Sequence, residues 1–298
     1  MWHVTRIPLR KAASGEDEQS AALLRIVDAA TPEVDALIFD ILERASEGLS
    51  QAELAPLLIA GDQAGLFEQV QQAWEAVGYR RLWASVVPAL QRVAVDVLVQ
   101  LPAPGLPATA MLPGLYERVL AHIGDRIVAI DATTREAIRN TIEQALVRGD
   151  SVGIMAERIR GQVGLTPSQV SQVARFSEGL QRAGEAPQRI EELTAPLIVR
   201  LKRDRALRIA RTETVTAANA GEYARLEQAV AAGYVDPGDI RRYWLTSEDD
   251  RVCPYCAPVP GLNPEGVGLE EPFQTALGEA LHPALHPNCR CTTVIRIL

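Results

Sequence analysis

The chain has 298 residues, a hydrophobic fraction of 47% and a formal net charge of −8 at pH 7, which suits one large or two ordinary globular domains. No apolar run approaches the roughly 20 residues that span a bilayer, and the N-terminus lacks the apolar stretch of a secretory signal, so we expect synthesis in a cytoplasm and no membrane span. The negative charge excludes a surface that is basic throughout, so any DNA contact must be local.

Residues 16–100 are predicted to be helical. Their apolar residues recur at intervals of three and four positions, and this pattern is expected to be interrupted at Thr31-Pro32 and at Gly48. The next segment, residues 101–114, holds four prolines and two glycines, which cannot continue a helix. We therefore place a domain boundary in this segment, which ends a helical N-terminal domain over residues 1–105.

The second domain, residues 106–298, is predicted to be helical from 113 to 233. Separate helices are expected to begin at Asp150 and at Thr166, where a capping residue, a first-turn proline and a glutamine follow one another. The chain from Pro196 to about Gly233 is rich in Ala, Leu, Arg and Glu. This composition favours one long helix.

Residues 234–298 differ in amino-acid composition from the helices before them. The runs 241–246 and 292–297 are rich in aromatic and β-branched residues, which favours strands. We expect these two strands to pair antiparallel around the cysteines. The predicted fold class is therefore mainly α, with a helical N-terminal region, a long helix and a small α+β Cys/His module that is like a zinc knuckle.

The four cysteines lie close together in the sequence and are predicted to form one local site. Cys253 and Cys256 form a C-x2-C pair, whose tight turn brings two thiolates to one cation. His286, Cys289 and Cys291 offer an imidazole and two more thiolates. We expect a structural Zn²⁺ bound by Cys253, Cys256, His286 and one of Cys289 or Cys291.

Other interpretations of this cluster stay open. An all-cysteine shell is the alternative ligand set, and a pair of disulfides is the alternative to a metal. Zn²⁺ is favoured over redox metals because a closed set of soft ligands suits it and leaves no open position. His282 lies four residues before His286, but Pro283 and Pro287 preclude a regular helix there, so His282 is expected to be an exposed loop residue.

The predicted long helix carries one concentrated basic stretch. It could contact DNA phosphates or an acidic partner, and the alternative is a solvated face balanced by Asp204 and Glu213. The basic residues are Arg200, Lys202, Arg203, Arg205, Arg208 and Arg211.

A polar stripe follows on the same helix. Thr212, Thr216, Asn219 and Tyr223 recur at intervals of three and four residues, which predicts hydrogen-bonded packing against the strands and the cysteine module. Glu213 lies beside the stripe without a paired carboxylate, a nucleophile or a phosphate-binding glycine loop. We therefore expect no catalytic residues and no enzymatic activity.

Four sequence blocks occur in a fixed order: ARTETVTAANAGEYARLE (210–227), YWLTSEDDRVCPYC (243–256), EEPF (270–273) and HPNCRC (286–291). A lone C-x2-C would be a weak signal, but this ordered combination is specific. It resembles the head morphogenesis family of tailed phages, which includes the Mu F-like minor head proteins. With a similar helical stretch upstream, the resemblance covers about residues 130–298.

The resemblance carries expectations about function. It implies a minor head protein that acts in procapsid assembly and lies inside the virion head near the portal or the packaged DNA. The implied partners are portal, capsid or scaffold proteins, with a DNA contact through Arg200–Arg211 as a further option. The alternative is a DNA-binding or ejected effector-type protein carried in the virion. Besides the Cys/His cluster, the positions that match family signatures are Arg211, Thr212, Glu213, Trp244, Asp250 and Arg251.

This chain departs from the family pattern at one place. Many relatives have a short turn after the second cysteine, whereas this chain has a longer, proline-rich loop over residues 257–273.

Overall fold

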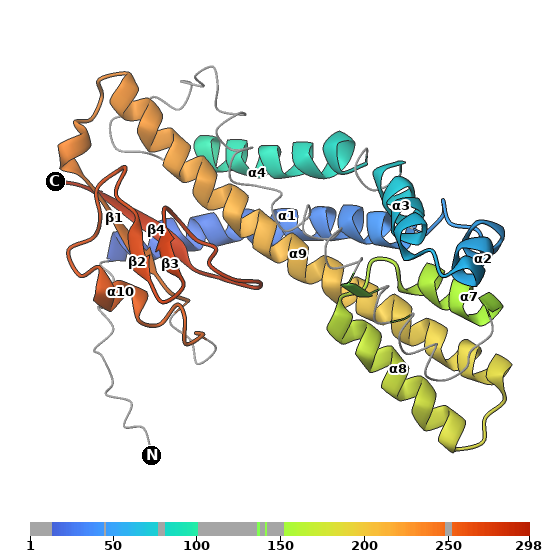
Figure 1. Ribbon diagram of the computed structural model, residues 1–298. Coiled ribbons are helices and arrows are strands. Elements are labelled where there is room, and N and C mark those ends of the chain that lie inside the picture. The colour runs from blue at the N-terminus through green and yellow to red at the C-terminus, as the bar shows by residue number, and fades with distance from the viewer. Residues whose placement is uncertain are drawn as a thin grey trace, which may run out of the picture. The chain divides into compact units, whose positions relative to one another are not determined.

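Figure 1 shows the computed structural model, which describes residues 14–44, 46–76, 81–100, 136–137, 141, 152–247 and 252–298. The predicted hinge at 101–114 lies outside these residues. Asp250, Arg251 and all but three residues of the helical region expected between 113 and 149 also lie outside them. None of the described helices is both long enough and apolar enough to cross a membrane.

The chain forms two compact units, each built from segments that are far apart in the sequence. The first, which we call the C-terminal unit, comprises Met1–Val34, Pro88–Ile123 and Ala210–Leu298. The second, which we call the middle unit, comprises Asp35–Val87 and Gly124–Ile209. The division into an N-terminal domain over residues 1–105 and a second domain over 106–298 stays a prediction.

The first helix, α1 (Ser14–Arg44), runs through Pro32, so the interruption predicted at Thr31-Pro32 is wrong. Pro32 is exposed, so the carbonyl group that loses its helical partner can bond to water instead. Val27 and Val34 are buried and hold the helix to its core. Gly48 lies in the turn after α1, as predicted.

The predicted long helix is α9 (Pro187–Ala231), which begins earlier than expected because the exposed Pro196 lies inside it. In the C-terminal unit α9 passes very close to α4 (Val87–Gln100). A Cβ atom added at Gly221 would lie 2.8 Å from the Cα of Ala94. The absence of a side chain at Gly221 therefore allows the two helix backbones to approach each other.

The middle unit is helical. One helix begins as the sequence predicts, because Thr166 and Gln169 cap each other's backbone N–H groups and Pro167 occupies the first turn. Its core includes Leu165, Val170 and Leu201. The other helical elements described within the middle unit are α2 (Gln51–Ala60), α3 (Gln63–Trp74), η2 (Leu82–Val86), α7 (Val152–Gln162) and α8 (Pro167–Arg182).

The two predicted strands, β1 (Ile240–Leu245) and β4 (Thr292–Ile297), pair antiparallel with Trp244 opposite Thr293, which confirms the prediction. A hairpin of two short strands, which the sequence did not predict, lies between them in the chain, and Figure 1 shows it near α10. The mainly α fold with a small α+β C-terminal module is therefore confirmed. The remaining elements are η3 (Pro237–Asp239), α10 (Val259–Leu262), β2 (Phe273–Thr275) and β3 (Gly278–Ala280).

Candidate metal centre

The first two sulfur atoms of the site come from the turn that follows β1. The backbone N–H of Cys256 donates to the Sγ atom of Cys253 at 3.3 Å. Such N–H groups offset negative charge on a thiolate. The C-x2-C turn therefore presents two sulfurs in one direction, as its spacing predicts.

An imidazole nitrogen meets these sulfurs from the loop before β4. The Nε2 atom of His286 lies 2.9 Å from the Sγ atom of Cys253 and 3.1 Å from that of Cys256. The Nδ1 atom of His286 lies 2.9 Å from the backbone oxygen of Pro287. Because a carbonyl oxygen can only accept, Nδ1 carries the proton and the lone pair of Nε2 is directed at the sulfurs.

The last two cysteines complete the cluster. The Sγ atoms of Cys256 and Cys289 are 3.8 Å apart. This matches the edge of a tetrahedral Zn²⁺ shell, because bonds of about 2.3 Å place two sulfurs about 3.8 Å apart. Two triads of ligand atoms share Cys256, and within each triad the atoms lie within 4.8 Å of one another. The triads are Cys253, Cys256 and His286, and Cys256, Cys289 and Cys291.

The five residues singled out from the sequence thus meet at one place, and they could hold a metal ion. All four cysteines are free thiols in the structure. The chemistry of the donor set fits a soft, four-coordinate cation, because it offers four sulfurs and one imidazole and includes no carboxylate among these groups.

The close packing of sulfurs makes their pKa values diverge. Hydrogen bonds from the side chains of Cys256 and Cys291 lower the pKa of the Cys289 thiol, and the backbone N–H groups of Cys291 and Leu285 lower it further. The hydrogen bond with Cys289 raises the pKa of Cys256. One thiolate is therefore favoured at the centre of the cluster, with the neighbouring thiols as its donors.

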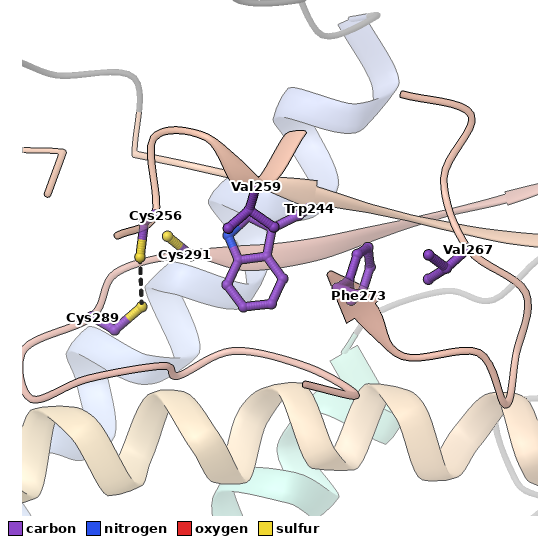
Figure 2. Close-up of a cluster of buried hydrophobic side chains, with 7 residues drawn as sticks. All are labelled: Trp244, Cys256, Val259, Val267, Phe273, Cys289 and Cys291. Carbon is purple, nitrogen blue, oxygen red and sulfur yellow. Dashed lines mark hydrogen bonds between the residues drawn. The ribbon is translucent and has the colours of Figure 1, made fainter. Parts of the chain in front are cut away.

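An aromatic core supports the cluster from one side, as Figure 2 shows. Trp244 is 2% exposed and packs edge-on against Phe273, with ring centroids 5.3 Å apart. The indole nitrogen of Trp244 faces Cys291 in Figure 2, and its interaction with this thiol acts to lower the pKa of Cys291. Trp244, which matched a family signature, therefore lies between the sulfurs and the rest of the hydrophobic core.

Arg242 is a buried residue of this module that the sequence analysis missed. Its side chain is 1% exposed and donates to the backbone oxygens of Gly268, Glu271 and Leu281. Burial lowers its pKa to about 10. The guanidinium thus ties the loop and hairpin of the module to β1. Arg242 alternates with Ile240 and Trp244 on the buried face of β1, and this period-2 pattern is the signal that could have identified it.

The polar stripe of α9 binds this module, as predicted. The backbone N–H of Asn288, in the loop that carries His286 and Cys289, donates to the Oγ1 atom of Thr212 at 2.9 Å. The backbone N–H of Thr293, in β4, donates to the Oδ1 atom of Asn219 at 3.1 Å. Glu213 is also buried. The stripe therefore positions both the loop that carries His286 and Cys289 and the strand that follows it.

Glu222 lies beside the stripe, between Asn219 and Tyr223 in the sequence, and the sequence analysis also missed it. It is fully buried, accepts hydrogen bonds from Gln19 at 2.7 Å and Thr293 at 3.2 Å, and lies 3.6 Å from Arg225. Burial raises its pKa to about 7. Glu222 thus links α1, α9 and β4 within the C-terminal unit. Its spacing of three residues from Asn219 is the signal that could have identified it.

Two basic residues of α9 are not on the surface, in contrast to the prediction of one basic stretch. Lys202 and Arg205 are buried, and Arg205 donates to the backbone oxygen of Gly164 at 2.6 Å. Burial lowers the pKa of both. The arginines of the stretch that remain exposed are Arg200, Arg203, Arg208 and Arg211.

His282 is likewise not an exposed loop residue. Its ring is partly buried, with its centroid 6.3 Å from that of Tyr223, and its Nδ1 atom lies 2.7 Å from the backbone oxygen of Pro283. His282 belongs to neither group of candidate ligands. The loop folds back on α9, which the prolines in the sequence did not reveal.

A sequence model of the family described as "Phage Mu protein F like protein" matches residues 136–294. This range is more than half of the chain and includes β1, β4 and all five candidate ligands. No curated protein and no solved structure matches the chain significantly.

Proposed function

Because the chain belongs to the phage Mu protein F like family, a family of phage head morphogenesis proteins, we propose that it is a minor head protein of a tailed bacteriophage. It acts in procapsid assembly and stays inside the head, near the portal and the packaged DNA. The observation that carries this proposal is the family match over residues 136–294. The chain works through binding surfaces, so it is not an enzyme, and its partners are portal, capsid or scaffold proteins.

Mass spectrometry of purified procapsids and virions tests this role. The chain is expected in both particles at low copy number, and the tagged chain is expected to retain the portal protein in a pull-down. Absence of the chain from both particles would overturn the proposal. Normal assembly of filled heads by a phage that lacks the chain would contradict a role in assembly.

The Cys/His cluster has a structural role in this proposal. Zn²⁺ is held by Cys253, Cys256, His286 and Cys289, and Cys291 stays a thiol beside Trp244. Cys289 is preferred as the fourth ligand because its sulfur lies 3.8 Å from that of Cys256 and because backbone N–H groups stabilise its thiolate. Bound Zn²⁺ would cross-link the turn after β1 to the loop before β4 and so hold the module on α9. Such a closed shell has no open position for catalysis.

DNA binding is a second candidate function, and the exposed arginines of α9 favour it. Their replacement by glutamine, as Arg200→Gln, Arg203→Gln, Arg208→Gln and Arg211→Gln, is expected to weaken binding in a gel shift. The salt dependence should also fall, by a slope of about 0.9 for each lost phosphate contact. The matched control replaces four other exposed arginines instead, Arg25, Arg175, Arg182 and Arg189. Equal loss in both sets would show non-specific attraction and exclude a dedicated site.

A further inference from the structure

A groove lies in the long loop and hairpin of the C-terminal module. It has a volume of about 420 Å³, and Glu265, Glu271 and Glu279 contribute to its lining together with Leu262 and Val267. None of the residues that line it is basic. It is therefore a concave surface that joins three carboxylates to aliphatic side chains.

The chain segment that forms the groove is also acidic, and the cation beside it is the buried Arg242, which interacts with Glu271. Residues 252–289 contain four glutamates and no lysine or arginine. Leu262 and Leu277 are 51% and 54% exposed, which is high for aliphatic side chains. The occupant that complements this surface is a short peptide segment that carries both basic and apolar side chains.

We propose that residues 1–13 of this chain, which we call the N-terminal segment, bind in this groove. The segment contains Arg6, Arg10 and Lys11 and no Asp or Glu, so its charge is opposite to that of the groove. It also contains Trp2, Ile7 and Leu9. These supply apolar surface for contact with the exposed Leu262.

The place where α1 begins brings the N-terminal segment within reach. α1 starts at Ser14, and Gln19 accepts a hydrogen bond from the backbone N–H of Ile295 in β4 at 3.5 Å. Ile295 pairs with Arg242, which forms a bridge with Val267 in the lining of the groove. Two strand spacings amount to about 10 Å, whereas thirteen extended residues span about 43 Å. The segment can therefore reach the groove of its own chain.

Carbodiimide cross-linking of the intact chain tests this proposal. The reagent joins a lysine to a carboxylate in direct contact, and the chain has only two lysines, Lys11 and the buried Lys202. Peptide mapping is expected to find Lys11 joined to Glu265, Glu271 or Glu279. The yield should fall severalfold in high salt, because contacts between exposed charges are screened.

Two variants, one in the N-terminal segment and one elsewhere, test whether the cross-link depends on the charges of the segment. The double variant Arg6→Gln, Arg10→Gln keeps Lys11 in place and is expected to lower the yield at least fivefold. The matched control, Arg25→Gln with Arg182→Gln, removes two exposed charges elsewhere and should leave the yield unchanged. Equal yields in both variants would overturn the proposal, as would links from Lys11 to carboxylates outside the groove alone.

A mixture of ¹⁴N-labelled and ¹⁵N-labelled protein identifies which copy supplies the segment. Cross-links within one isotope are expected, because the segment is tethered close to its own groove and so has a high effective concentration. Cross-links that join the two isotopes in statistical proportion would overturn binding within the chain and assign the groove to a second copy.

Discussion

Removal of the proposed Zn²⁺ should open the C-terminal module and leave the middle unit folded. Apparent binding energies of structural Zn²⁺ are about 10–16 kcal/mol, which is comparable with the whole stability of a domain, about 5–15 kcal/mol. The core around the cluster is small, with Trp244 and Phe273 as its large side chains. This core cannot replace so large a contribution, so we expect a chelator to unfold the module.

Hydrogen exchange followed by mass spectrometry measures this effect segment by segment. Peptides that cover residues 252–291 should lose their protection after chelation, whereas peptides from α8 should keep theirs and serve as the internal control. Metal analysis of the untreated protein should find one zinc ion per chain. Cys289→Ser should remove the zinc, and Cys291→Ser should retain it.

Two results would refute this reasoning, and a third would change only the assignment of the fourth ligand. Protein that contains no zinc and no free thiols would show that the cysteines form disulfides. Unchanged exchange after complete removal of the zinc would show that packing alone holds the module together. Loss of zinc from Cys291→Ser together with its retention in Cys289→Ser would reverse the assignment of the fourth ligand.

Three further predictions concern residues that hold the C-terminal unit together, and urea unfolding checks each of them. Gly221→Ala should destabilise the protein by about 1–3 kcal/mol, because its Cβ would lie 2.8 Å from the Cα of Ala94. Gly179→Ala, where no atom lies within 4 Å of the added Cβ, should stabilise by about 0.5–1 kcal/mol; equal effects would disprove the close crossing. Arg242→Met should cost about 3 kcal/mol because it removes the charged donor of three hydrogen bonds to backbone carbonyl oxygens, and a neutral effect would contradict its role. Glu222, whose pKa is raised to about 7 from 4.5, binds a proton more tightly in the folded than in the unfolded chain. The free energy of unfolding should therefore fall by up to about 3 kcal/mol as pH rises from 4.5 to 7. Glu222→Gln should remove this fall and be more stable than the parent at pH 8, and an unchanged pH profile would assign the proton to another group.

The sequence predicted those parts of the fold that depend on local patterns. The cap at Thr166, the antiparallel pairing of 241–246 with 292–297 and the polar stripe on α9 were confirmed. The predictions made at two prolines were wrong: α1 continues through Pro32, and α9 begins before Pro196. Both prolines lie on exposed helix positions, where water can replace the lost hydrogen bond. Whether a proline ends a helix depends on what surrounds it, and a single sequence does not contain that information.

The candidate site was likewise predicted only as far as local sequence patterns determine it. The types and spacing of Cys253, Cys256, His286, Cys289 and Cys291 identified one cluster, because thiolates and imidazoles with these separations are typical of soft-metal sites. Their order among the other blocks also identified the family, which the match over residues 136–294 confirms. These conclusions depend only on side-chain chemistry and local spacing, and both are written in the sequence.

Tertiary structure decided which groups are buried and which sulfurs are neighbours. It placed Cys289 at 3.8 Å from Cys256 and turned the indole of Trp244 toward Cys291. It also buried Arg242 and Glu222, although charged side chains are usually exposed. Burial and contact arise where strands and helices distant in the chain pack together, so no local sequence pattern specifies which charged groups are buried or which sulfurs meet.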